Sequence, residues 1–161
     1  MVLYTFNVIE ILELAASLKY SPDPEKRAIK IKDILEDLEL TKVQNVKAGE
    51  RDSAGANILS RGEKKRLSIA IELITNPALI FMDEPTTSMD TFTAEKIIEI
   101  IRKLASKGKT IIATIHQPNS EIYKKLDRLM LLSYGHTIYF VLYSLTSNRE
   151  NLRMQYHTLM P

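Results

Sequence analysis

The sequence Ala-Leu-Ile-Phe-Met-Asp-Glu-Pro-Thr-Thr-Ser-Met-Asp, residues 78–90, decides the fold class of this chain. Its apolar half has the length of a β-strand, and Pro85 ends that strand directly after Asp83 and Glu84. Open α/β sheets bind ligands at the carboxyl ends of their strands, so both acids are expected in a ligand site. Asp83 is suited to holding Mg²⁺ through water, and Glu84 to accepting a proton from an attacking water. This pattern is typical of nucleoside triphosphate hydrolysis, although an ordinary polar turn has a similar composition.

Alternating helix and strand patterns follow this stretch. Beyond the strand at 78–82, the predicted segments are a helix over 94–107, a strand over 110–115, a short helix over 120–126, and strands over 128–132 and 137–140 joined by a turn at Gly135-His136. Strand–helix–strand order implies a parallel sheet, and β-branched, apolar composition predicts that its strands are buried. This half of the chain is therefore expected to be α/β.

Helical patterns precede the deciding stretch. The predicted segments are helices over 7–19, 24–40 and about 60–75, with a loop over 41–58. Asp23 is suited to the N-cap of the second helix and Pro24 to its first position. The apolar stripes expected in the core are Val8, Ile11, Leu12, Ala15 and Leu18; Ala28, Ile31, Leu35 and Leu38; and Ile97, Ile98, Ile101 and Leu104. The predicted fold class is α/β, a helical lobe followed by the later strands of a mostly parallel sheet.

Composition sets limits on the class of protein. The chain has 161 residues, about one domain, with 45% hydrophobic and 26% charged residues. A net charge of +2 gives no footprint for nucleic acid, and the densest basic run, residues 61–66, is short and contains Glu63. The lack of cysteine excludes disulfides and thiolate-bound metals. No apolar run reaches about 18 residues, so no membrane helix is predicted in this sequence.

The segment Leu59-Ser60-Arg61-Gly62-Glu63 opens the third predicted helix. Ser60 and Glu63 have the spacing of a capping box, which by itself predicts only a helix start. A helix N-terminus also presents unpaired N–H groups and partial positive charge, which suit a phosphate. Gly62 would let the backbone approach that phosphate, and the Ser60 hydroxyl would add a donor. Both interpretations fit the same residues.

His116 and Asp90 are the remaining candidates for a site. His116 directly follows the second predicted strand, so it is expected at the same sheet edge as the acid pair. An imidazole there could bond a terminal phosphate or position an attacking water, but a histidine at a strand end is also an ordinary polar cap. Asp90 precedes a predicted helix, where a turn residue near a helix start is the simpler interpretation.

These segments occur in an order that resembles the nucleotide-binding domain of ABC ATPases, a P-loop NTPase fold. Leu59–Glu63 is similar to the signature motif, Ala78–Glu84 to Walker B, Ser88-Met89-Asp90 to the D-loop and His116 to the switch histidine, within a likeness that runs from about Phe6 to Phe140. The resemblance implies ATP and Mg²⁺ as ligands, with Asp83 on the metal and with Glu84 and His116 in catalysis. It further implies nucleotide contacts by Leu59, Ser60, Arg61, Gly62, Glu63 and Asp90.

The closer resemblance is to White-type, or G subfamily, half-transporters. Residues 62–70, Glu72-Leu73-Ile74, Asp83–Thr87, Ile115–Pro118 and Phe6–Glu10 carry it. It implies ATP hydrolysis coupled to export, a second nucleotide-binding domain as dimer partner, a transmembrane domain encoded elsewhere, no nucleic-acid partner, and a position on the cytosolic face of a membrane. A soluble ABC ATPase acting on DNA or ribosomes is an alternative that this sequence context disfavours.

The chain departs from the family pattern in three places. No G-x-x-x-x-G-K-[ST] occurs around its five glycines, so the Walker A cradle and its lysine are missing from this sequence. Arg61 stands at the usual first glycine of the signature, which favours a degenerate site. Residues 141–161 diverge from the family. The expected organisation is a partial nucleotide-binding domain over 1–140, incomplete at both ends, with a helical lobe at about 6–75, an α/β part at about 76–140 and a divergent tail.

Two expectations follow for the polypeptide by itself. It should show negligible ATPase activity, because it cannot hold ATP over its own Glu84, although it could donate its signature to a second domain. A non-catalytic fragment that pairs with an intact nucleotide-binding domain is therefore kept as an alternative to an ATP-hydrolysing subunit. A sheet that lacks its central strands also leaves edges and apolar faces exposed, which predicts poor solubility.

Overall fold

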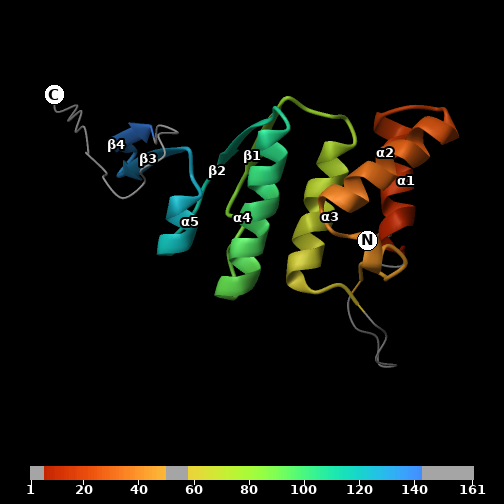
Figure 1. Ribbon diagram of the computed structural model, residues 1–161, viewed down its shortest axis with the longest axis horizontal. Helices are drawn as coiled ribbons and strands as arrows, with labels where there is room; N and C mark the ends of the chain where they lie inside the picture. The colour runs from red at the N-terminus through yellow and green to blue at the C-terminus, as the bar shows by residue number, and fades with distance from the viewer. Residues whose placement is uncertain (1–5, 50–57, 143–161) are drawn as a thin grey trace. The chain divides into compact units, whose positions relative to one another are not determined.

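The computed structural model describes residues 6–49 and 58–142, and its contacts divide the chain into two units, residues 1–117 and 118–161. Figure 1 shows the first unit as a group of helices followed by a strand–helix–strand unit. Its elements are α1 (Val8–Lys19), α2 (Pro24–Asp37), the 3₁₀ helix η2 (Thr41–Val43), α3 (Arg61–Leu73), β1 (Leu79–Met82), α4 (Thr91–Ser106) and β2 (Thr110–Ala113). The predicted helices and the α/β order are confirmed, although α2 ends at Asp37 and not at residue 40. Residues 50–57 of the predicted loop and 143–161 of the predicted tail lie outside the described residues, and the domain boundaries stay predictions.

Short polar side chains determine where the long helices begin. Oxygen atoms of Asn7, Asp23, Ser60 and Asp90 accept hydrogen bonds from first-turn N–H groups of α1, α2, α3 and α4, respectively. These N-caps satisfy donors that a helix start otherwise leaves unpaired. The Asp90 cap explains why α4 begins at Thr91, three residues before the predicted start at 94.

One hydrophobic core joins the helices of the first unit to its strand–helix–strand part. Leu12 and Leu38 are fully buried in this core, and Leu104 of α4 belongs to it. The predicted stripes are wrong at two positions, because Leu18 is 77% exposed and Ala28 is also exposed. Residue spacing shows which side of a helix is apolar, but it does not show how far along the helix its neighbours extend.

β1 and β2 form a parallel pair connected by α4. The register places Ile80 beside Ile111 and Met82 beside Ala113. The predicted stripe of α4 is confirmed, since all of its members are buried, namely Ile97, Ile98, Ile101 and Leu104. Because α4 packs against β2, the strand–helix–strand unit buries one face of its sheet.

The other face of this sheet is apolar and exposed. Leu79, Phe81 and Ile112 are 46%, 72% and 52% exposed, respectively, whereas Ile80 on the helix side is buried. The prediction of buried strands is therefore wrong for this face, because among the described residues of the first unit α4 covers only the opposite face. β2 also ends at Ala113 and not at residue 115. Poor solubility stays a prediction, which this apolar face supports.

The second unit contains a short helix, α5 (Ser120–Lys124), and an antiparallel hairpin of β3 (Arg128–Ser133) and β4 (His136–Leu142). The turn residues are Tyr134 and Gly135, with φ values of 47° and 77°, the left-handed pair typical of two-residue hairpin loops. The turn predicted at Gly135-His136 is one residue late, because His136 is already in β4. Across the described ranges, no helix combines the length and apolar character needed to cross a membrane.

Ion pairs connect the end of α2 to α4 in the first unit. Asp37 lies 2.6 Å from Lys107 and 3.3 Å from Lys103, and Glu39 lies 2.7 Å from Lys96. Partial burial acts to raise the pKa of Asp37, but the hydrogen bonds from Lys107 and Lys103 outweigh it and hold that pKa below its ordinary value. The hydrogen bond from Lys96 likewise lowers the pKa of Glu39.

These ion pairs predict that acid weakens the contact between α2 and α4. A carboxylate whose pKa is lowered by folding stabilises the folded state above its unfolded pKa of roughly 4, and this stabilisation is lost as pH falls through the folded value. Between about pH 7 and about pH 3, the urea midpoint should therefore fall less steeply in Asp37→Asn than in the parent. Glu36→Gln, at an exposed neighbouring position of α2, is the control. Equal slopes for the parent and Asp37→Asn would refute this expectation.

Candidate functional site

The ends of β1 and β2 bring the predicted acids beside a threonine. Parallel pairing continues past the strands, where the Thr114 N–H donates to the Met82 carbonyl at 3.0 Å. The Thr114 hydroxyl donates to Asp83 Oδ1 at 2.6 Å and accepts from the Glu84 N–H at 3.0 Å. One hydroxyl therefore orients both the Asp83 carboxylate and the Glu84 backbone. His116 follows two residues later at the same sheet edge, with an exposed side chain.

Glu84 has a left-handed backbone conformation, with φ 42°. In a residue other than glycine this conformation costs about 1–2 kcal/mol, so surrounding contacts must hold it. The Thr87 hydroxyl donates to Glu84 Oε2 at 2.6 Å, and the Thr87 N–H donates to the Glu84 carbonyl at 3.3 Å. Lys65 Nζ donates to the Asp83 carbonyl at 3.3 Å and to the Glu84 carbonyl at 3.4 Å. Within the described parts of the chain nothing donates to Glu84 Oε1, which leaves that oxygen available to a water.

The start of α3 lies against the residues that follow Glu84. The guanidinium of Arg61 donates to the Ser88 carbonyl at 3.2 Å. Gly62 is buried, and a Cβ placed on it would lie 2.8 Å from Thr93 Cγ2 of α4. The contact between α3 and α4 therefore requires the glycine, a packing reason that the sequence pattern did not suggest. The predicted approach of its backbone to a phosphate stays a prediction.

Ser60 and Glu63 form the capping box that their spacing predicted. Ser60 Oγ accepts from the Glu63 N–H at 3.3 Å and donates to Glu63 Oε2 at 2.7 Å, while the Ser60 N–H donates to the same carboxylate oxygen at 2.8 Å. Ser60 and Arg61 are exposed at this helix start, but Leu59 is only 2% exposed and belongs to the hydrophobic core. The side chain of Leu59 therefore anchors the segment, and it is the two following residues that present polar groups to solvent.

Asp90 has a structural role as the N-cap of α4. Its Oδ2 accepts from the Thr93 hydroxyl at 2.6 Å and its Oδ1 from the Thr93 N–H at 3.0 Å. These two hydrogen bonds, the hydroxyl first, lower the pKa of Asp90. The contacts agree with the helix-start interpretation, and because Asp90 is exposed, a contact with nucleotide stays a prediction.

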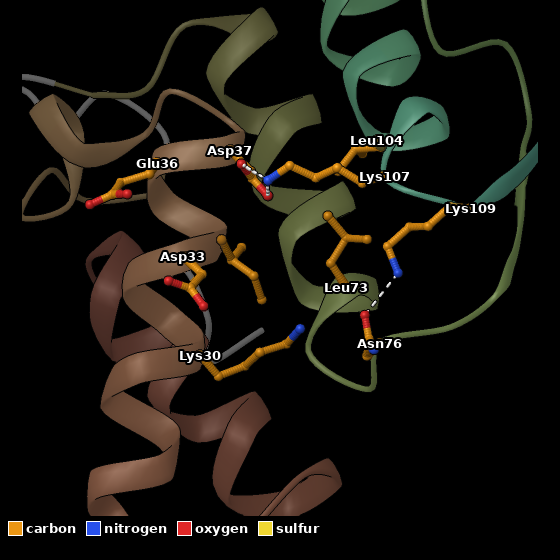
Figure 2. A pocket seen from close by; sticks show the side chains of 10 residues that line it. Lys30, Asp33, Glu36, Asp37, Leu73, Asn76, Leu104, Lys107 and Lys109 are labelled. Carbon is orange, nitrogen blue, oxygen red and sulfur yellow. Dashed lines mark hydrogen bonds and ion pairs between the residues drawn. The ribbon is translucent and has the colours of Figure 1, made fainter.

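A cavity of about 330 Å³ lies at the opposite, amino-terminal edge of the strands (Figure 2). Its walls include Lys30 of α2, Leu73 of α3 and Lys109, which precedes β2. Burial, followed by the charge of Lys109, lowers the pKa of Lys30. None of the predicted site residues lines this cavity, and Asp83 and Glu84 lie away from it at the exposed edge described above.

The order of these elements is that of a known family. The family model for ABC transporters matches residues 5–87, just over half of the chain, and includes α1, α2, α3, β1 and the acid pair. The chain belongs to the ABC transporter family. It carries part of the ATP-binding domain of the G family, as the similarity to individual relatives shows.

Two curated relatives and one solved structure illustrate this similarity. The chain is 42% identical over 136 residues to ABC transporter G family member 3 of Dictyostelium discoideum, covering 83% of this chain and 10% of the relative. It is 38% identical over 133 residues to Protein scarlet of Drosophila melanogaster, covering 81% of this chain and 20% of the relative. A dimeric ATP-binding cassette in a post-hydrolysis state, bound to ADP and Pi, matches with a TM-score of 0.65 and 27% identity over 88% of this chain and 58% of that chain. The chain thus spans between a tenth and a fifth of the length of these two relatives.

The residues that the structure describes in this ABC domain could bind Mg²⁺ only together with ligands from water and substrate. Among the described residues, no group of three or more His, Cys, Asp or Glu side chains could hold a metal ion without other ligands. Mg²⁺ usually keeps several waters and binds one or two carboxylates together with substrate phosphates. Asp83, an exposed carboxylate oriented by Thr114, fits that type of coordination.

Three residues of this candidate site were not predicted from the sequence: Thr114, Thr87 and Lys65. Thr87 could have been found, because it lies only three residues after Glu84. Thr114 is 31 residues from Asp83, and its position depends on the strand register. Lys65 is 18 residues from Asp83 and reaches it from another element, so no local pattern indicated the contact.

Proposed function

We propose that this chain belongs to an ATP-hydrolysing domain of a G-type exporter. It would supply the sheet edge that carries Asp83 and Glu84, and the signature segment Leu59–Glu63. Asp83 would hold Mg²⁺ together with waters and phosphate oxygens, and the metal would supply charge stabilisation of the phosphates. The observation that carries the proposal is the Thr114 hydroxyl, which bonds both the Asp83 carboxylate and the Glu84 N–H at one sheet edge. Adjacent acids are thereby oriented for different tasks.

Glu84 is proposed as the proton acceptor. Thr87 occupies its Oε2, so Oε1 is the oxygen that would take the proton as water attacks the terminal phosphorus and the bond to the ADP oxygen breaks. A positioned general base contributes about 10²- to 10⁴-fold to such a rate. His116, exposed at the same edge, is proposed to donate a hydrogen bond to the terminal phosphate.

The start of α3 is proposed to bind the nucleotide of a second domain. Ser60 now donates to the Glu63 carboxylate, and a phosphate oxygen could replace that acceptor. Arg61 and Gly62 provide N–H groups at the same helix start, where partial positive charge favours an anion. Leu59, Glu63 and Asp90 complete the proposed set, with Leu59 acting through its backbone because its side chain is buried. The dimeric cassette bound to ADP and Pi supports a two-domain arrangement.

The wider proposal follows from the relatives. Their membership of the G family of ABC transporters supports export driven by ATP, a transmembrane domain as partner, and a position on the cytosolic face of a membrane. The 161 residues contain no G-x-x-x-x-G-K-[ST], so other residues must hold the phosphates of any ATP above Glu84. That observation favours one second candidate, a fragment that pairs with an intact nucleotide-binding domain without hydrolysing ATP itself.

A mixing experiment tests whether the signature is donated to a second domain. The purified chain with ATP and Mg²⁺ should show no turnover, whereas adding it to an intact nucleotide-binding domain of a G family relative should raise the turnover of that domain. Ser60→Ala should reduce the stimulation by at least about tenfold, because one hydrogen bond to a charged group contributes about 1.5–3 kcal/mol. Ser68→Ala, an exposed serine later in α3, is the matched control. Equal turnover with and without the chain would contradict the donated signature, and binding without stimulation would favour the non-catalytic candidate.

A further inference from the structure

The segment that follows β1 contains two left-handed residues, and α3 binds the carbonyl oxygen of each. The φ values are 42° at Glu84 and 62° at Ser88, and neither residue is glycine. Lys65 Nζ lies 3.4 Å from the Glu84 carbonyl oxygen, and the Arg61 guanidinium lies 3.2 Å from that of Ser88. Arg61 and Lys65 are four residues apart and therefore share one face of α3. Two cations on a single helix face thus contact the carbonyl groups of both left-handed residues.

Lys65 makes a second contact that depends on the conformation of Glu84. Its ammonium group also binds the Asp83 carbonyl at 3.3 Å. In an extended strand, consecutive carbonyl groups point in opposite directions, so one ammonium group cannot bind both. The left-handed turn at Glu84 is what brings the two oxygens together, and an ammonium group with three donors is suited to bridge them. The two contacts and the φ of Glu84 therefore support one another.

We propose that Lys65 is a positioning residue for Glu84, and that Arg61 has the same role for Ser88. The inference rests on the proposed role of Glu84 as proton acceptor. The φ of Glu84 sets the direction of its Cα–Cβ bond, and this direction determines where the carboxylate meets an attacking water. Thr114 and Thr87 hold other atoms of Glu84 from the sheet edge and from the following loop. Lys65 holds the backbone from α3, so it links the signature helix to the position of the catalytic carboxylate.

The full 161-residue chain provides the test, because the readout is conformational and needs no ATP turnover. The Thr87 N–H donates to the Glu84 carbonyl, so its hydrogen exchange reports on this turn, while the HN–Hα coupling and carbonyl ¹³C shift of Glu84 report on its φ. Lys65→Met should raise the hydrogen-exchange rate of the Thr87 N–H about tenfold. It should also shift the coupling constant and the carbonyl shift of Glu84 away from the values of a left-handed residue. Lys65→Arg should restore both. Lys64→Met, which removes the same charge one position earlier, should leave both unchanged.

Exchange at Ala16, fully buried in α1, separates a local effect from a general one. If Lys65→Met removes the left-handed coupling and shift values of Glu84 while Ala16 exchange is unchanged, the inference is supported, whatever the ATPase measurements show. If those values of Glu84 are unchanged in Lys65→Met, the inference is overturned and the proposed hydrolysis is left intact. Equal increases at Thr87 and Ala16 also overturn it, because Lys65 would then only stabilise the fold.

Discussion

Replacing Glu84 by glutamine lowers the rate of ATP hydrolysis by about 10²- to 10⁴-fold in a polypeptide that joins a G family phosphate-loop segment ahead of Met1. Glutamine preserves the size of the side chain, and its carbonyl oxygen can still accept the hydrogen bond from Thr87. The fold and the affinity for ATP should therefore change little, while the proton acceptor is lost. The measurements are the rate of phosphate release at saturating ATP and, in parallel, the affinity for ATP. The rate should fall while the affinity stays nearly the same.

The matched control for this experiment is Glu13→Gln, an exposed glutamate of α1 on the same polypeptide. It should leave the rate within about twofold of the parent, because a surface substitution away from the site has only a small effect. If Glu84→Gln retains a comparable rate, another group takes the proton and the assignment of Glu84 is wrong. In the unextended chain the same substitution should have no measurable effect, since no turnover is expected there.

Gly62→Ala destabilises the first unit by about 1–3 kcal/mol, the typical cost of overpacking a well-packed contact. The new Cβ would lie 2.8 Å from Thr93 Cγ2, so α3 and α4 would have to move apart. Helix propensity alone predicts a change of the opposite sign, because alanine is favoured over glycine in helices, by about 1 kcal/mol in their interior. The change in the free energy of unfolding on Gly62→Ala, measured in urea, therefore distinguishes the two effects: a decrease indicates packing and an increase indicates helix propensity.

Thr93→Ser is the matched second substitution for this experiment. It removes the Cγ2 methyl group but keeps the hydroxyl that donates to Asp90, so the α4 cap remains. In the Thr93→Ser background, Gly62→Ala should lose most of its cost, which gives a coupling energy of at least about 1 kcal/mol. Additive effects of the two substitutions would mean that Gly62 is needed for a reason other than its contact with Thr93.

Local sequence patterns predicted the elements of this protein well. Apolar spacing located the long helices, and Asp23, Ser60 and Asp90 stand at helix starts because their short side chains can bond first-turn N–H groups. Pro85 and the preceding apolar run placed Asp83 and Glu84 at a strand end, since the chain itself connects these residues. Patterns were less accurate about burial, as Leu18 and Phe81 show, because exposure depends on what covers a face.

Sequence patterns were therefore sufficient to predict the helices, the strand order, the family resemblance and the acid pair at the end of β1. The tertiary structure alone showed that Thr114 orients both acids, that Lys65 and Arg61 bind the left-handed residues that follow, and that Gly62 packs against Thr93. A local sequence pattern contains information about residues a few positions apart, but not about which distant residues come into contact. These contacts join residues 18 to 31 positions apart, so they exist only once strand register and helix packing bring their atoms within bonding distance.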